Sequence, residues 1–254
     1  MKKIVKVRNL EIGHGIPKIC VPLVSKTNED IIKDATDLKY FKLDLVEWRA
    51  DYYEDIEDLD KVKEILKELR SILQNLPILF TFRRKREGGE KEISLEYYKK
   101  LNEEVIKTSM VDLIDIELSV GDEVVKDIVD FAHNNNVKVV ISNHDFYKTP
   151  QKDKIINRLC KMQDLGADLP KIAVMPQNSK DVITLLSATE EMEREYARTP
   201  IITIAMGKLG LVSRLTGEIF GAAITFGTVK IASAPGQIEL EELYKILNII
   251  HKSK

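Results

Sequence analysis

Two residues with reactive side chains border strand-like apolar runs. His144 ends the run VKVVISNHD (137–145), and Lys171 opens the run KIAVMP (171–176). An imidazole exchanges protons near neutral pH, so a histidine at a strand end could act as a general acid and base. Lys171 could be catalytic if its long side chain points inward. The simpler alternatives are a hydrogen-bonded core histidine and a solvated lysine at a strand start.

A second stretch has nearly the same local pattern as the one around Lys171. PKICVPLV (17–24) places Lys18 before an apolar run, just as PKIAVMPQ (170–177) places Lys171. Local pattern therefore cannot separate a catalytic lysine from one that only begins a strand. The distinction depends on the elements that position each side chain.

Short apolar runs alternate with longer amphipathic segments along the whole chain. The strand candidates are residues 19–24, 43–49, 78–83, 112–118, 137–145, 171–176, 201–206 and 223–229. Helical patterns include residues 61–76, 98–110, 123–136, 181–197 and 239–252. Such alternation is typical of βαβ units, and near-continuous apolar strands indicate a parallel sheet buried on both faces.

The alternation predicts an α/β fold in which eight strands close into a (β/α)8 TIM barrel. No linker rich in Pro, Gly or Ser interrupts it, so residues 1–254 are predicted to form a single domain. Residues 1–15 lie outside the repeat. They include IVKVRNLEIG, which predicts a hairpin turned at Arg8 and Asn9 that caps one end of the barrel.

Composition excludes several classes of partner. The 39 basic and 41 acidic residues are interspersed and give a formal net charge of -2, which favours neither nucleic acid nor an anionic membrane surface. The two cysteines, Cys20 and Cys160, lie far apart and outside any zinc-binding pattern. No signal-peptide pattern or bilayer-spanning run occurs, so a cytoplasmic location is predicted.

Polar residues cluster where several predicted strands end, which in such barrels is the active-site face. They are Glu47, Arg49, Arg83, Asp115, Glu117, His144 and, after the last strand, Ser233. Structural alternatives remain: Arg83 could begin a solvated loop, and Glu47 and Arg49 could pair with each other or with Glu117. His14, His133 and His251 are predicted to be structural or solvent-facing.

Other catalytic signatures are absent from the sequence. There is no GxGxxG after a strand, no GxxxxGK[ST], no HExxH and no GxSxG. A thiol–imidazole pair of Cys20 with His144 remains an alternative, although a strand cysteine is more often inert packing.

Several motifs, in order and over the full length, closely resemble those of type I 3-dehydroquinate dehydratases, the Schiff-base lyases of the shikimate pathway. They are EWR (47–49), FTFR with EGGE (80–83, 87–90), SNHDF (142–146), LGAD with PKIAVMPQ (165–168, 170–177), SRL with GE (213–218) and SAPGQ (233–237). The resemblance implies conversion of 3-dehydroquinate to 3-dehydroshikimate by loss of water. It implies no metal or other cofactor.

The resemblance also implies catalytic roles. Lys171 would form the Schiff base with the substrate ketone, and His144 would transfer protons while Glu87 holds and tunes the imidazole. Burial and neighbouring arginines would favour the neutral amine. Members of the family are commonly homodimers, so a homodimer is expected here.

The substrate-binding residues implied by the resemblance surround these groups. Arg214 matches the arginine that binds the carboxylate, for which a planar guanidinium is well suited. The remaining residues are Glu47, Arg49 and Arg83 around the ring hydroxyls, Ser233 and Gln237 on a closing loop, and Phe146, Met206 and Ala234 on apolar walls. Pro22 departs from a serine found in several members, and Ser25 could supply the missing hydroxyl.

Two rival functions share some of these features. Another class I Schiff-base aldolase or lyase would have the barrel and the lysine but should carry a phosphate-binding loop after the seventh and eighth strands. A barrel that only binds small acids would be expected to have lost Lys171 or His144, and this chain has both.

Overall fold

The structure is a computed structural model that describes residues 4–229 and 233–253. Its centre is a parallel sheet with the strand order β10-β3-β4-β5-β6-β7-β8-β9. The strands are β3 (Lys18–Leu23), β4 (Leu45–Arg49), β5 (Ile78–Thr81), β6 (Leu113–Glu117), β7 (Lys138–Asp145), β8 (Leu169–Val174), β9 (Ile202–Ala205) and β10 (Ile224–Thr228).

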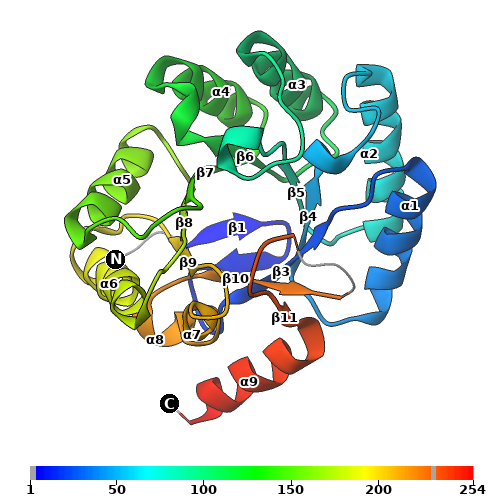
Figure 1. Cartoon of the computed structure of the whole chain (residues 1–254). Coiled ribbons are helices and arrows are strands. Elements are labelled where there is room, and N and C mark those ends of the chain that lie inside the picture. Colours follow the sequence, from blue (N-terminus) through cyan, green and yellow to red (C-terminus); the bar gives the residue numbers. More distant parts are fainter. Residues whose placement is uncertain (1–3, 230–232, 254) are drawn as a thin grey trace.

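The sheet closes on itself between β9 and β10. A parallel bridge joins Ile201 to Ala222, and the Ala223 N–H donates to the Ile201 carbonyl at 2.8 Å. Figure 1 shows the resulting ring of strands with helices around its outside. The predicted (β/α)8 barrel is confirmed.

Helices follow the strands and cover the outer face of the barrel. They are α1 (Asn28–Asp37), α2 (Leu59–Leu73), α3 (Leu95–Lys107), α4 (Asp122–Asn134), α5 (Lys152–Asp164), α6 (Ser179–Glu191), α7 (Leu211–Leu215), α8 (Gly217–Phe220) and α9 (Leu240–Lys252). The side chains of Thr27, Asp58, Ser94 and Asn178 cap four helix starts by accepting backbone N–H bonds. Among the residues described, no helix is long and apolar enough to cross a membrane.

Each predicted strand differs from the observed one by one or two residues at one or both ends. One difference matters for function, because β8 begins at Leu169 and Lys171 is therefore its third residue, whereas Lys18 is the first residue of β3. Residues 238–239 form a short strand, β11 (Ile238–Glu239), which pairs with β10 just before α9. The prediction had given residue 239 to the helix.

The N-terminal hairpin is present and closes the amino end of the barrel. Strands β1 (Val5–Val7) and β2 (Leu10–Ile12) pair antiparallel around Arg8, whose φ of 52° lies in the left-handed region that such a turn needs. Val5, Val7 and Ile12 are buried in one apolar cluster with strand residues that include Leu45, Leu79, Leu113, Val140 and Leu169. The predicted cap is confirmed for the residues described.

We expect the substitution Ile12→Ala to lower the free energy of unfolding by about 2–5 kcal/mol, because it removes most of a fully buried side chain and leaves a cavity in its place. Urea unfolding would measure the change. Glu11→Ala, on the exposed face of the same strand, is the matched control and should change stability by less than about 1 kcal/mol. Equal effects of the two substitutions would contradict the capping role of the hairpin.

Candidate active site

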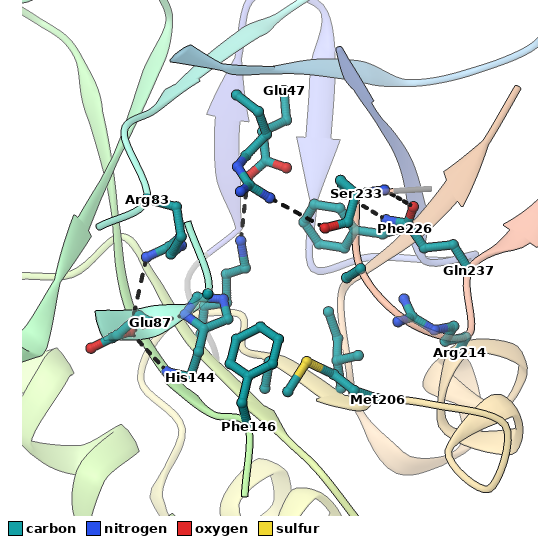
Figure 2. Close-up of a pocket in the computed structure, with 16 residues that line it drawn as sticks. Glu47, Arg83, Glu87, His144, Phe146, Met206, Arg214, Phe226, Ser233 and Gln237 are labelled. Carbon is teal, nitrogen blue, oxygen red and sulfur yellow. Dashed lines mark hydrogen bonds and ion pairs between the residues drawn. The ribbon is translucent and has the colours of Figure 1, made fainter. Parts of the chain in front are cut away.

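One cavity gathers all twelve residues that the sequence predicted for the site. It lies at the carboxyl end of the barrel (Figure 2) and is lined by Glu47, Arg49, Arg83, Glu87, Gly88, His144, Phe146, Lys171, Ala173, Ile204, Met206, Arg214, Phe226, Ser233, Ala234 and Gln237. These side chains come from six strands and the segments that follow them. Parallel strands place their carboxyl ends at one edge, which explains why residues so far apart in sequence meet here.

Lys171 points into the barrel from the middle of β8. Successive side chains of a strand point to opposite faces, so Pro170 and Ile172 point away from the face that carries Lys171. Ile172 packs in the apolar cluster between the barrel and the helices. Lys171 Nζ lies 3.1 Å from Asp115 Oδ2 and 3.5 Å from Glu47 Oε1. The charged groups in direct contact with Nζ are thus carboxylates, while the arginines expected near the amine line the same cavity.

His144 and Glu87 form a pair on the cavity wall. Glu87 Oε2 accepts from both the backbone N–H and the ring Nδ1 of His144, at 2.9 and 3.0 Å. Because a carboxylate can only accept, Nδ1 carries the hydrogen and Nε2 is left as the acceptor. Burial and the charge of Arg83 lower the pKa of His144 to about 4, although Glu87 acts in the opposite direction. The imidazole is therefore neutral at pH 7 and able to take a proton.

Glu87 remains a carboxylate in this setting. Burial by itself would raise the pKa of Glu87, but the hydrogen bond from His144 and the nearby charge of Arg83 outweigh burial and lower it. Gly88 follows in the left-handed region with φ of 83°, and a Cβ there would lie 2.2 Å from the ring of Phe146. The glycine thus lets the Glu87 turn pack directly against the apolar wall of the cavity.

Arg83 is buried and fully paired, so the alternative of a solvated loop residue was wrong. Its Nη2 lies 2.7 Å from Asp115 Oδ1, and its Nη1 lies 3.2 Å from Glu117 Oε1 and 2.8 Å from Ser142 Oγ. Burial opposes its charge, but the two carboxylates dominate and raise the pKa of Arg83. It is a permanent cation at the cavity floor.

Arg49 pairs with Asp51, a partner that the sequence did not indicate. Both nitrogens of its fork contact the Asp51 carboxylate at 2.7 Å. The alternative in which Arg49 pairs with Glu47 or Glu117 was therefore wrong. Glu47 instead accepts from Thr81 Oγ1 at 2.9 Å and faces Lys171.

Arg214 differs from the other two arginines because it has no carboxylate partner within residues 4–229 and 233–253. Its side chain is 2% exposed, and Nη2 donates to the Pro235 carbonyl at 3.1 Å. Its Nε has no hydrogen-bond partner in the same described segments. Burial lowers the pKa of Arg214 to about 10, which leaves it cationic at neutral pH. A buried, uncompensated guanidinium on a cavity wall is a site for an anion.

The rest of the cavity combines an apolar wall with a polar loop. Phe146, Met206 and Ala234 line the cavity, and Figure 2 labels Phe146 and Met206 among its side chains. In the loop, the Ser233 N–H donates to Gln237 Oε1 at 2.8 Å, and Gln237 Nε2 donates to Ser233 Oγ at 3.0 Å. These two residues are held together as one unit at the cavity mouth.

Some residues of the site were missed, and some alternatives fail. Phe226 lies with its ring centroid 4.7 Å from Lys171 Nζ and had no signal beyond its apolar strand. Ser25 does not replace the hydroxyl missing at Pro22, because it donates to Asp34 and does not line the cavity. Cys20 is buried in the apolar cluster that contains the hairpin residues, where burial raises its pKa, and within the described residues no hydrogen bond joins it to His144.

The arrangement contains groups for proton transfer, a lysine amine and an anion site in one cavity. Within the described part of the chain, no set of three or more His, Cys, Asp or Glu residues is placed to hold a metal ion. Asp115 lies at a predicted strand end and Ser142 within a motif, but neither was predicted to belong to the site. Both lie directly beneath its charged residues.

The fold and this cavity define a (β/α)8-barrel enzyme. Residues 19–254 match the family model described as type I 3-dehydroquinase, and the chain belongs to that family. The resemblance drawn from the sequence and the prediction of a hydro-lyase are both confirmed.

Similar proteins match this chain over nearly their full length and its own. A 3-dehydroquinate dehydratase of Clostridioides difficile is 58% identical over 253 residues, covering 100% of this chain and 99% of that protein. A crystal structure of the type I enzyme from Clostridium difficile with covalently modified comenic acid has a TM-score of 0.98, with 58% identity and full coverage of both chains. A crystal structure of 3-dehydroquinate dehydratase from Geobacillus kaustophilus has a TM-score of 0.96 at 38% identity, covering 98% of this chain and 97% of that one.

We expect His144 in the folded protein to stay neutral until the pH falls to about 4, whereas in the unfolded chain it titrates near its ordinary value of 6.5. Protonation then favours unfolding, so stability is lost as the pH falls from about 6.5 to about 4. Proton NMR of the histidine ring would measure the midpoint, with His144→Gln to assign the resonance. A midpoint at pH 6 or above would contradict the effect of burial and Arg83.

Proposed function

We propose that this protein dehydrates 3-dehydroquinate to 3-dehydroshikimate through a Schiff base on Lys171, with His144 as general acid and base. The observation that carries the proposal is that Lys171, the His144–Glu87 pair and the uncompensated Arg214 line the same cavity. The names of the relatives support the substrate. The covalently modified ligand in the Clostridium difficile structure supports a nucleophile in this kind of site.

The first step joins substrate and enzyme. Lys171 Nζ attacks the ketone carbon, a C–N bond forms, and the ketone oxygen leaves as water to give a cationic iminium. The iminium withdraws electrons from the neighbouring C–H bond and so makes its proton easier to remove. His144, neutral and with Nε2 unprotonated, is suited to take that proton.

The second step expels the hydroxyl. The protonated His144 returns its proton to the departing oxygen, which leaves as water while the electrons of the enamine form the new carbon–carbon double bond. Hydrolysis of the iminium then releases the product and restores the lysine. Glu87 fixes the imidazole through Nδ1 during these transfers and stabilises its cationic form.

The substrate would be oriented by charge and by hydrogen bonds. Its carboxylate would pair with Arg214, whose guanidinium has no carboxylate partner in the described segments. Glu47, Arg49 and Arg83 would contact the ring hydroxyls, and the Ser233–Gln237 unit would close over them. Phe146, Met206 and Ala234 would cover the apolar faces of the ring.

Neither rival function has a supporting observation of equal weight. A phosphate-binding aldolase needs a cradle of backbone amides, whereas the anion site here is a single side-chain guanidinium, Arg214. A barrel that only binds acids does not account for an oriented His144–Glu87 pair beside a buried lysine. The single domain over residues 1–254, the cytoplasmic location, the homodimer, the absence of a cofactor and the place in the shikimate pathway stay predictions from the sequence.

The proposal predicts a covalent adduct on Lys171. Incubation with 3-dehydroquinate and sodium borohydride should add the mass of one reduced substrate or product, located at Lys171 by peptide mass spectrometry. Lys171→Ala should give no adduct, whereas Lys18→Ala, the twin at the start of β3, should behave as the wild type. An adduct that persists in Lys171→Ala would refute the assignment.

His144→Ala separates proton transfer from condensation. We expect kcat for formation of the ultraviolet-absorbing product to fall by about 100-fold or more, because the general acid and base is removed. The adduct should still form, since the amine survives. Turnover close to that of the wild type would rule out His144 as the acid and base.

Arg214→Lys keeps the charge but loses the planar fork, so we expect KM for 3-dehydroquinate to rise by about tenfold or more. Steady-state kinetics measure the change. Arg198→Lys, at an exposed pair with Asp164, is the matched control and should leave the kinetics unchanged. An unchanged KM in Arg214→Lys would remove this residue from the site.

A further inference from the structure

Lys171 rests on a buried carboxylate that is outside the cavity lining. Asp115 on β6 is fully buried, and its Oδ2 lies 3.1 Å from Lys171 Nζ, closer than Glu47 Oε1 at 3.5 Å. Asp115 does not line the cavity, so a bound substrate would touch Lys171 but not Asp115. Any effect of Asp115 on the reaction must therefore pass through a cavity residue that it contacts, either Lys171 or Arg83, and a probe of the Nζ amine itself separates the two.

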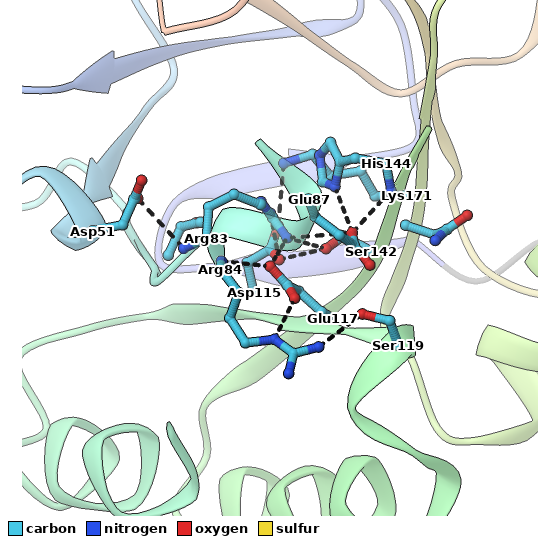
Figure 3. Close-up of polar contacts among 12 residues, drawn as sticks. Asp51, Arg83, Arg84, Glu87, Asp115, Glu117, Ser119, Ser142, His144 and Lys171 are labelled. Atoms are coloured by element: carbon cyan, nitrogen blue, oxygen red, sulfur yellow. Dashed lines mark hydrogen bonds and ion pairs between the residues drawn. The ribbon is translucent and has the colours of Figure 1, made fainter. Parts of the chain in front are cut away.

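The carboxylate of Asp115 is itself fixed. Its other oxygen, Oδ1, is 2.7 Å from Arg83 Nη2 and accepts from Ser142 Oγ at 2.5 Å. Ser142 in turn accepts from Arg83 Nη1 at 2.8 Å, which closes a triangle of contacts (Figure 3). One oxygen is therefore held by two donors, while the second is presented to Nζ at a set position.

The charges around Nζ are supplied by several elements. Facing it are Asp115 from β6, Glu47 from β4, Arg83 after β5, His144 from β7, the Cys20 thiol from β3 and the Phe226 ring from β10. Burial opposes ionisation of Asp115, but Arg83 and Lys171 outweigh burial and lower its pKa. Asp115 therefore remains an anion at neutral pH, and its Oδ2 and the aromatic face of Phe226 both lie beside Nζ.

We propose that Asp115 is the positioning residue of Lys171, the fixed counter-ion of its nitrogen both in the resting ammonium and in the iminium with the ketone substrate. The part of this proposal that concerns the iminium rests on the proposed function. Condensation of an ammonium with a ketone gives one iminium and one water, so the positive charge is at the same nitrogen before and after. An anion fixed beside that nitrogen serves both states without rearrangement.

A purely structural ion pair would predict something different. It would predict that loss of Asp115 lowers stability and leaves the reactivity of the Lys171 amine unchanged. The counter-ion role predicts instead that the free amine becomes more available when the anion is removed. The reactivity of Nζ is thus the property that separates the two roles.

The test labels Lys171 with cyanate, which carbamoylates only the neutral amine and needs no substrate. At pH 7 in the full-length protein, we expect Asp115→Asn to increase the labelling rate at Lys171 at least about fivefold, because the ammonium loses its nearest anion. Peptide mass spectrometry measures the rate. A smaller increase overturns the proposal. Asp168→Asn is the matched control: this buried carboxylate pairs with His133 and Lys138 and should leave the rate at the wild-type value.

Turnover provides the second readout. Because Asp115 does not touch the cavity, we expect kcat to fall about tenfold or more in Asp115→Asn while KM changes by less than about threefold. If Asp115→Asn does not fold, Ser142→Ala decides the question, since it keeps every charge and removes only the hydroxyl that donates to Oδ1 and accepts from Arg83 Nη1. It should raise the labelling rate at least about twofold, and an unchanged rate overturns the proposal.

The two hypotheses can fail separately. If the wild type forms no adduct with 3-dehydroquinate but labelling still rises in Asp115→Asn, the proposed function fails and the resting counter-ion stands. If the adduct forms but labelling does not respond, the proposed function stands and the role of Asp115 fails.

Discussion

The buried guanidinium of Arg83 is the interaction on which the polar half of this barrel depends. It contacts Asp115 and Glu117 on β6 and Ser142 on β7, and so joins the segment after β5 to the next two strands. Charges removed from water must be compensated, because an unpaired one costs several kcal/mol. Arg83 thereby allows Asp115 and Glu117 to stay buried as charged or hydrogen-bonded groups. It also fixes the start of the turn that carries Glu87 to His144.

The interior of the barrel is divided along its axis. Its amino end is filled by apolar side chains and closed by the hairpin, where Ile12 is fully buried. Its carboxyl end holds the charged residues and the open cavity. The apolar base excludes water from beneath the site, which strengthens the electrostatic interactions above it. The hairpin therefore contributes to the site although it supplies none of its side chains.

Three buried arginines line the cavity, and their hydrogen-bond partners differ. Arg83 is paired with two carboxylates, and Arg49 is paired in a fork with Asp51, so both are anchored within the protein. Arg214 donates to a backbone carbonyl and has no carboxylate partner within the described segments. Its charge is thus available to an anionic ligand. The same residue type is thus paired with carboxylates in two cases and left without one, among the described residues, in the third.

The barrel, the hairpin and twelve of the residues that line the cavity could be predicted from the amino-acid sequence. Alternating apolar and amphipathic runs encode a parallel sheet covered by helices, and residues at strand ends meet at one edge because the strands are parallel. This architecture can therefore be predicted without knowing which side chains contact one another. The order of motifs then assigned the family to which the chain belongs.

Which charges pair could not be predicted from the sequence and is seen only in the folded barrel. Lys171 and Lys18 share a local pattern, but one is third in its strand and points inward while the other is first. Arg49 binds Asp51 in the turn directly after its own strand. Asp115 on β6 lies beneath Lys171 on β8, with β7 between them, because contacts across the barrel depend on register and on side-chain direction, which a linear pattern does not contain. Electrostatic pairing in a buried site is a property of three-dimensional distance, and distance is set only when the barrel closes.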